Sequence, residues 1–225
     1  MKHTPYFNLL EALKEGCPLC FLVKKAAHKL MDSFLYESVN DSAIRKEIIA
    51  SKGFCNRHAW QLQKLGDGLG QAIVYNDLIE RHLQELTEIN TSASLKELIK
   101  KVSPKKSRKK ICMFCKQEKD AEERYLSVFW ESFGDSEFNA QYKNSFGLCL
   151  PHLSAALKKS KDMELSKELT AIESKKLEDL ITELKEYKRK HDYRFSREKL
   201  GKEGDSWVRA IEKFMGKKGI YEKGV

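Results

Sequence analysis

The sequence predicts an all-α protein built from two tandem, pseudo-repeated helical units. Apolar residues recur at spacings of three and four along most of the chain, which is the pattern of one face of a helix. No run of alternating apolar residues is bounded by turn signals, so no sheet is expected. A Cys-x-x-Cys pair and a Cys-x-x-His pair each occur twice and in the same order, which indicates an internal duplication.

The cysteines and histidines define the repeat. The Cys-x-x-Cys pair returns after 95 residues and the Cys-x-x-His pair after 94 residues. The deletion of one residue falls in a loop between helices, where residues 36–42 correspond to residues 131–136. The pairs in chain order are Cys17 with Cys20, Cys55 with His58, Cys112 with Cys115, and Cys149 with His152.

Each unit is expected to contain the same helices in the same order. The first follows the Cys-x-x-Cys pair, as in residues 21–35. The second begins at an Asp-Ser cap, Asp41-Ser42 or Asp135-Ser136, whose side chains can accept hydrogen bonds from free N–H groups. The third begins at the Cys-x-x-His pair, and a longer helix closes each unit at about residues 69–89 and 163–187.

The remaining segments set the expected domain boundaries. Residues 92–102 suit a short helix, and residues 103–110 read as a linker. Gly204-Asp205-Ser206 is expected to cap a last helix, which covers residues 207–215 and ends at Gly216. The predicted domains are a first helical metal-binding unit at 1–92, a basic linker at 93–110, a second metal-binding unit at 111–192, and a C-terminal helix and tail at 193–225.

The positive charge of the chain is concentrated in one segment. The chain has 225 residues and a formal net charge of +9, but eight Lys or Arg and one acid lie between Leu95 and Lys110. That segment, 96–110, is the candidate contact for a protein or nucleic-acid partner, and a solvated linker is its ordinary alternative. No secretory signal or membrane span is visible, so we expect a cytoplasmic protein without membrane contact, in which thiols stay reduced.

The paired spacing of cysteine and histidine indicates structural metal sites. Residues three apart lie on one face of a helix, and Zn²⁺ prefers four thiolate or imidazole ligands in a tetrahedron. We expect two Zn²⁺ ions per chain, one in each half, and each ion would join two helix N-termini. The expected ligands are Cys17, Cys20, Cys55 and His58 in the first half, and Cys112, Cys115, Cys149 and His152 in the second.

Other uses of these cysteines fit the sequence less well. An iron–sulfur cluster ranks second, since three cysteines and one histidine can hold one. Buried cysteines of the core have no reason to fall in pairs three residues apart, and a thioredoxin-like dithiol needs a βαβ unit. A c-type haem needs a histidine directly after the second cysteine, but Phe21 and Lys116 stand there.

Several motifs together resemble an uncharacterised family of bacterial proteins, a domain-of-unknown-function family with duplicated metal-binding units. The family pattern is a helix-starting Cys-Pro-x-Cys followed by Gly-Phe-Cys-x-x-His, and the chain departs from it at Met113, where proline would be expected. The resemblance covers nearly the whole chain and implies the fold and the metal, but no activity. The residues that carry it are 17–20, 53–60, 66–70 and 191–195.

A catalytic assignment is not supported by the sequence. Four protein ligands at each site leave no position for a reactive water, so hydrolytic zinc is not expected and no catalytic residue is assigned. His191-Asp192 could orient a catalytic group, but such a pair more often ends a helix. The leading hypothesis is a non-enzymatic zinc-binding helical scaffold for another macromolecule. The rival is a redox- or metal-responsive regulator that uses the zinc-bound thiolates, and the oligomeric state is left open.

Overall fold

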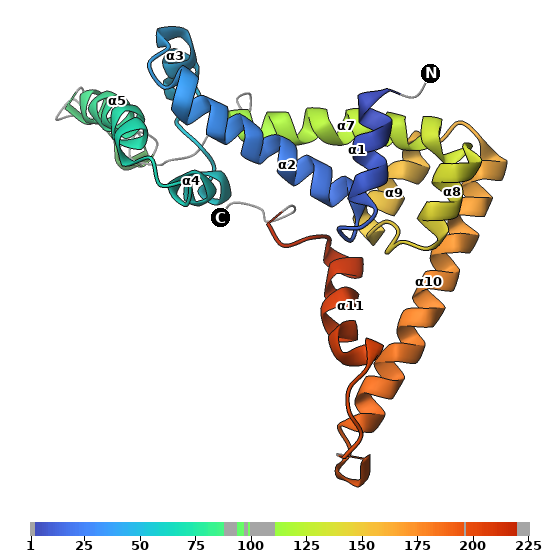
Figure 1. Cartoon of the computed structure of the whole chain (residues 1–225). Helices are drawn as coiled ribbons and strands as arrows, with labels where there is room; N and C mark the ends of the chain where they lie inside the picture. Colours follow the sequence, from blue (N-terminus) through green and yellow to red (C-terminus); the bar gives the residue numbers. More distant parts are fainter. Residues whose placement is uncertain (1–2, 88–93, 97–98, 100–110, 196, 220–225) are drawn as a thin grey trace. The chain divides into compact units, whose positions relative to one another are not determined.

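The computed structural model describes residues 3–87, 94–96, 99, 111–195 and 197–219, and these residues are mostly helical with no strand among them (Figure 1). The predicted all-α class is confirmed. The first part of the chain forms α1 (Thr4–Ala12), α2 (Pro18–Ser33), the π-helical η1 (Phe34–Ser38), α3 (Ser42–Ala50), α4 (Asn56–Gln63) and α5 (Gly68–Thr87). The second part forms α7 (Met113–Phe133), α8 (Ser136–Lys143), α9 (Leu150–Lys159), α10 (Met163–Lys190), the 3₁₀ turns η2 (Tyr193–Phe195) and η3 (Lys202–Asp205), and α11 (Ser206–Met215).

Two compact units share these helices, and neither is a continuous half of the chain. Unit 1 contains the described residues of Met1–Lys24 and Ala121–Glu222, and unit 2 contains those of Lys25–Asp120. Helix α2 begins in unit 1 and ends in unit 2, whereas α7 begins in unit 2 and ends in unit 1. Each unit therefore draws on both of the sequential units expected at 1–92 and 111–192.

The predicted Asp-Ser caps are made in both units. The Asp41 side chain accepts hydrogen bonds from the N–H groups of Ala43, at 2.7 Å, and Ile44, at 3.2 Å. Asp135 accepts from the N–H of Phe138 at 3.1 Å. These side chains satisfy N–H groups that the first turn of a helix leaves without partners, so α3 and α8 begin where the sequence indicates.

Aromatic side chains form much of both cores. In unit 1, Phe129, Phe133 and Phe138 are fully buried around Tyr142 and pack mostly edge to face, a preferred geometry for aromatic pairs. In unit 2, Phe114 stacks on Phe54 with ring centroids 5.0 Å apart. Phe114 follows Cys112 by two residues, so the core of unit 2 reaches the metal-ligand candidates directly.

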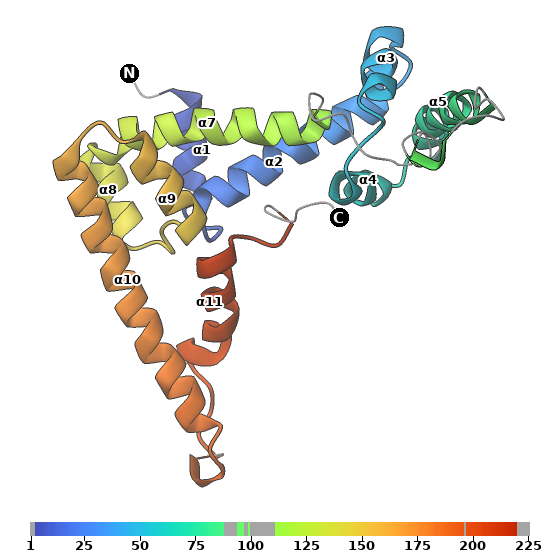
Figure 2. The ribbon, with the colours of Figure 1, turned by 180° about the vertical axis from the view of Figure 1, so that it is seen from behind.

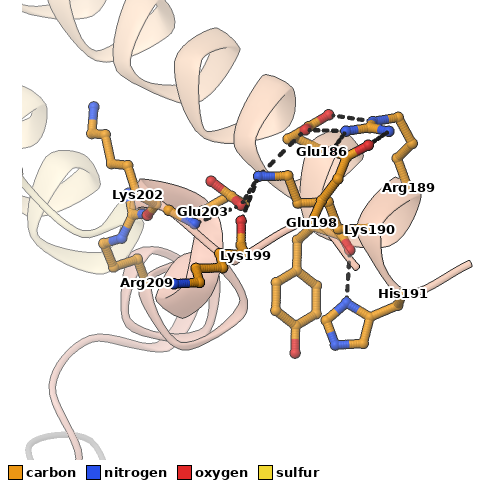
Figure 3. Close-up of polar contacts among 11 residues, drawn as sticks. Glu186, Arg189, Lys190, His191, Glu198, Lys199, Lys202, Glu203 and Arg209 are labelled. Carbon is orange, nitrogen blue, oxygen red and sulfur yellow. Dashed lines mark hydrogen bonds and ion pairs between the residues drawn. The ribbon is translucent and has the colours of Figure 1, made fainter. Parts of the chain in front are cut away.

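The C-terminal segment belongs to unit 1 and does not form a separate tail. After α10 the chain turns back, and α11 runs in the opposite direction along it (Figures 1 and 2). His191 is the C-cap of α10, and its Nδ1–H donates to the Tyr187 carbonyl at 2.8 Å (Figure 3). Asp192 pairs with Arg194. The His-Asp pair thus ends a helix.

The structure adds one helix that was not predicted and changes one predicted cap. Helix α1 was not expected, although Pro5 in its first turn and buried Leu9 are signals for a helix. The Asp205 side chain does not cap α11, because it accepts from Arg209 at 2.7 Å and a 3₁₀ turn leads into the helix. Most of the predicted helix at 92–102 and the whole of the linker at 103–110 lie outside the described residues.

Candidate metal centres

The eight predicted ligand residues form two clusters of four. Within each cluster, one donor atom from each residue lies within 4.8 Å of all the others. Each cluster offers three sulfur atoms and one imidazole nitrogen and could hold one metal ion. Site A consists of Cys17, Cys20, Cys149 and His152 in unit 1, and site B of Cys55, His58, Cys112 and Cys115 in unit 2.

The pairing of ligands differs from the expectation of one site in each half. Each site joins a Cys-x-x-Cys pair from one half to the Cys-x-x-His pair of the other half. The cause lies in the helices that follow the Cys-x-x-Cys pairs. The 16 residues of α2 extend about 24 Å and the 21 residues of α7 about 31 Å, and both helices pass from one unit into the other. The Cys-x-x-Cys pair and the Cys-x-x-His pair of each sequence half therefore lie in different units.

The candidate ligands lie at helix N-termini, where the sequence places them. Cys149 is the N-cap of α9 and Cys55 is the N-cap of α4, while Cys17 and Cys112 directly precede α2 and α7. The first turn of a helix presents free N–H groups and partial positive charge, which stabilise a thiolate. Each site thus receives this stabilisation from two helices.

A glycine in a left-handed conformation leads into each Cys-x-x-His pair. Gly53 has φ of +82° and Gly147 has φ of +79°, values at which a side chain would strain the backbone. At Gly147 a Cβ atom would also lie 2.3 Å from Glu173 Oε1. The repeated Gly-x-Cys pattern therefore has a steric reason: the chain turns sharply to place the third cysteine.

The spacing of donor atoms in site A fits a mononuclear tetrahedral ion. With metal–ligand bonds of about 2.3 Å to sulfur and 2.0–2.1 Å to nitrogen, a tetrahedron has S···S edges of about 3.8 Å and S···N edges of about 3.6 Å. The sulfur atoms of Cys20 and Cys149 are 3.7 Å apart. His152 Nδ1 lies 3.4 Å from Cys17 Sγ, 3.3 Å from Cys20 Sγ and 3.2 Å from Cys149 Sγ.

Site B has nearly the same spacing. Its Cys55 and Cys115 sulfur atoms are 3.6 Å apart. His58 Nδ1 lies 3.2 Å from Cys55 Sγ, 3.6 Å from Cys112 Sγ and 3.3 Å from Cys115 Sγ. All six cysteines are free thiols, so the proximity is not that of disulfides.

Protons compete with a metal for these donor atoms. Burial lowers the pKa of His58, but contacts with Cys112, Cys55 and Glu118 outweigh it and raise that pKa to about 10. For His152, contacts with Cys149 and Cys17 outweigh burial in the same way and raise the pKa to about 11. A bound cation would replace the Nδ1 proton in each ring, so binding should release protons.

One thiol in each site has a pKa well below that of an ordinary cysteine. Burial opposes ionisation of Cys17, but hydrogen bonds from Cys149 and Cys20 bring its pKa well below the ordinary value. Hydrogen bonds from Cys115 and Cys55 likewise lower the pKa of Cys112. Each site therefore holds a thiolate beside a positively charged imidazole, which is an arrangement that a divalent cation suits.

Two glutamates of α7 support the histidines from outside the clusters. Glu118 Oε1 lies 3.1 Å from His58 Nε2, and Glu122 Oε1 lies 3.4 Å from His152 Nε2. A carboxylate behind a histidine orients the ring and strengthens it as a ligand. Neither glutamate was predicted from the sequence. Glu118 stands one turn after Cys115, which is a usable signal, but nothing local connects Glu122 with site A.

Arg57 adds a buried charge beside site B. Its guanidinium donates to Glu118 Oε1 at 3.0 Å and also to Glu118 Oε2. Arg57 and Glu118 are each 9% exposed. A planar guanidinium that holds both oxygens fixes the carboxylate, which in turn fixes the His58 ring.

The two sites differ in solvent exposure. All four residues of site A are at most 3% exposed, whereas Cys55 and Cys115 of site B are partly exposed. The segment after α11 contributes to this difference, because the N–H of Lys217 donates to Cys20 Sγ at 3.4 Å.

A buried ion pair connects α11 with the turn that carries Cys149. Lys213 Nζ donates to Glu173 Oε2 at 2.6 Å, and both residues are at most 2% exposed. Glu173 Oε1 accepts from the Leu148 N–H at 2.9 Å and from the Tyr142 hydroxyl. Burial, and after it the contact with Glu173, raises the pKa of Tyr142 well above its usual range. The Tyr142 hydroxyl therefore keeps its proton.

The fold and the two sites define a class: all-helical proteins with two clusters of three cysteines and one histidine that could hold metal ions. None of the helices in the described part of the chain has the length and apolar character needed to cross a membrane.

The chain belongs to the family described as "Family of unknown function (DUF6062)", whose model matches residues 5–220. It is similar to an "Uncharacterized 23.9 kDa protein in xynA 3'region" of Caldicellulosiruptor sp. (strain Rt8B.4), with 31% identity over 193 residues that cover 83% of this chain and 88% of the relative. No solved structure matches the chain.

Proposed function

We propose that this protein is a non-enzymatic, cytoplasmic scaffold in which two structural Zn²⁺ ions, one in each of sites A and B, brace helices that contact another macromolecule. The observation that carries the proposal is the donor geometry: three sulfur atoms and one nitrogen at tetrahedral edge distances, with a carboxylate behind each histidine. Four protein donors complete the coordination of Zn²⁺, which is the arrangement of structural sites.

The same geometry favours a single ion over an iron–sulfur cluster. The thiolates of a [4Fe–4S] cluster bind different iron atoms and must stand well apart. Here all four donor atoms of each site lie within 4.8 Å of one another. This spacing supports one ion per site and the assignment of Zn²⁺ as the cofactor.

Elemental analysis of the protein purified without added metal tests the assignment. We expect about two zinc ions per chain and no visible absorption. Replacing all four donors of one site by serine should leave one ion, because the other site is complete by itself. Folded protein without metal, or stoichiometric iron with visible absorption, would contradict the proposal.

The interaction surface is placed in the basic segment of the chain. The segment 96–110 with its eight basic residues remains the candidate contact for nucleic acid, and most of it lies outside the described residues. A protein partner is the alternative. If the segment contacts phosphates, binding should weaken steeply with salt, and serine substitutions at its lysines should flatten that dependence.

A second candidate function is a redox-responsive regulator. The observation that favours it is the partial exposure of Cys55 and Cys115, whose sulfur atoms are 3.6 Å apart. Hydrogen peroxide could oxidise these two thiolates to a disulfide, with two protons taken up, two waters formed and the ion released. A thiol reagent on zinc-loaded protein separates the two functions: slow reaction at all six cysteines disfavours the regulator.

A further inference from the structure

Helix α11 has its polar side on the protein and its apolar side in solvent, the reverse of an ordinary surface helix. Ser206 and Lys213 on one side are at most 2% exposed. On the other side, five apolar residues are between 39% and 66% exposed. We call these the α11 face: Trp207, Val208, Ile211, Phe214 and Met215.

Charged contacts hold α11 in this orientation. Lys213 donates to Glu173 and to the Phe146 carbonyl, at 2.6 and 3.1 Å. Arg209 pairs with Glu183 and donates to the Lys202 carbonyl at 2.8 Å. Turning the helix to bury its apolar face would break these contacts and leave Glu173 buried without its ammonium partner.

The turn before α11 is also held by charges, which Figure 3 shows. Lys190 Nζ donates to Glu203 Oε1 at 2.8 Å and to the Lys199 carbonyl at 3.0 Å. Hydrogen bonds from the Gly201 N–H and from Lys190 lower the pKa of Glu203 to about 2, so its carboxylate is charged at neutral pH. The outward orientation of the α11 face is therefore built into its attachments on both sides.

The order of residues in the α11 face suits pairing with itself. Its positions are symmetric about Ile211, with spacings of one, three, three and one. If two copies of α11 run antiparallel around a two-fold axis at Ile211, Trp207 faces Met215 of the other copy and Val208 faces Phe214. Each pair combines a larger with a smaller or more adaptable side chain, and thioether–aromatic contacts are favourable.

The charges at the ends of α11 are also complementary in this arrangement. Asp205 stands at the N-terminal end, where its side chain is 68% exposed although it also pairs with Arg209, and Lys217 and Lys218 follow the C-terminal end. Antiparallel pairing brings each acidic end to a basic end, and it places opposite ends of the two helix dipoles together. A two-fold contact requires such self-complementarity, because the same patch must supply both partners.

We propose that the α11 face binds the α11 face of a second copy of this chain, giving an antiparallel two-fold dimer. Five exposed side chains provide a few hundred Å² per chain, below the roughly 800 Å² per partner of a standard stable interface. The dimer is therefore expected to be weak and to form in the micromolar range. The inference goes beyond the proposed scaffold function, because it requires no metal and names a surface and its partner.

Sedimentation of the purified, metal-loaded full chain over low to high micromolar concentrations tests this proposal. We expect a reversible monomer–dimer equilibrium. Ile211→Glu places two carboxylates together at the two-fold axis and should weaken association by about tenfold or more. Met163→Glu is the matched control, since Met163 is an exposed apolar residue of α10 in the same unit, and it should leave association unchanged.

Circular dichroism and zinc content of each variant show whether it folds and keeps its ions, so failure of the dimer and failure of the zinc sites can be told apart. A wild-type chain that stays monomeric at all concentrations overturns the proposal, as does a dimer that Ile211→Glu leaves intact. Monomeric protein that binds phosphatidylserine vesicles through the α11 face would also overturn it and would assign the face to a membrane surface.

Discussion

Cys55 combines a role in capping a helix with a role as a candidate metal ligand. Cys55 is the N-cap of α4, and its sulfur accepts the N–H of His58 at 3.5 Å. The same contact that begins the helix brings Cys55 and His58 onto one side of its first turn. Local helix geometry therefore brings together the two residues of each Cys-x-x-His or Cys-x-x-Cys pair, and each pair supplies half of one candidate site.

The first prediction tests which halves combine. The double variant Cys17→Ser with Cys149→Ser removes two donors from site A alone, so we expect it to keep one zinc ion per chain. The double variant Cys17→Ser with Cys55→Ser removes one donor from each site, and we expect it to lose most of both ions.

Zinc per chain, measured after exhaustive dialysis, gives the answer. Both variants lose two cysteines, so they are matched in composition. If each ligand set came from one sequence half, the two results would be exchanged: the variant with Cys17 and Cys55 replaced would keep one ion.

At the scale of elements, α11 is attached to unit 1 through charges at positions where a helix usually buries apolar residues. Lys213 of α11 reaches Glu173 of α10, and Glu173 also accepts the N–H of Leu148, next to Cys149. Charges in such a place require a partner, since an isolated buried charge is strongly disfavoured. The C-terminal helix and the turn at site A are therefore expected to be coupled in stability.

The second prediction concerns this ion pair. Lys213→Met should destabilise the protein by about 3 kcal/mol or more, because Glu173 is left buried without its cationic partner. Adding Glu173→Gln should recover part of the loss, since glutamine carries no charge but can still accept from Leu148. Denaturant unfolding of the zinc-loaded protein measures both effects.

Lys175→Met provides the control, because Lys175 lies on α10 with Glu173. Lys175 forms ion pairs with Glu178 and Asp179 at the surface, and its loss should leave the unfolding midpoint unchanged. Equal destabilisation by Lys213→Met and Lys175→Met would show that the buried pair has no special role.

At the scale of the whole molecule, each compact unit contains segments from both sides of residues 100–110. Unit 1 combines residues up to Lys24 with residues from Ala121 onward, and site A takes two donors from each of these segments. Site B likewise takes two donors from each side. The two parts of the chain should therefore remain together even without a continuous backbone.

The third prediction uses a cleavage site. If residues 103–110 are replaced by a protease recognition sequence and the chain is cut there, the fragments should elute together from a sizing column with two zinc ions. Treatment with a strong chelator should weaken this complex, because each ion joins the two fragments. Fragments that separate with one ion each would show that each ligand set lies within one half of the sequence.

The sequence by itself determined the helical class, the two Asp caps and the eight candidate donors. These features depend on contacts between near neighbours: a cap reaches two or three residues ahead, and a pair three residues apart shares one turn of helix. The caps at Asp41 and Asp135 could therefore be read directly from the chain.

Only the tertiary structure decided how the four pairs combine into two sites. Either Cys-x-x-Cys pair could meet either Cys-x-x-His pair, because the donors are chemically the same. The course of α2 and α7 from one unit into the other selects the pairing. The contacts of Glu122 with His152 and of Lys213 with Glu173 likewise left no local signal in the sequence. The paired residues are 30 and 40 positions apart, and only tertiary packing brings them together.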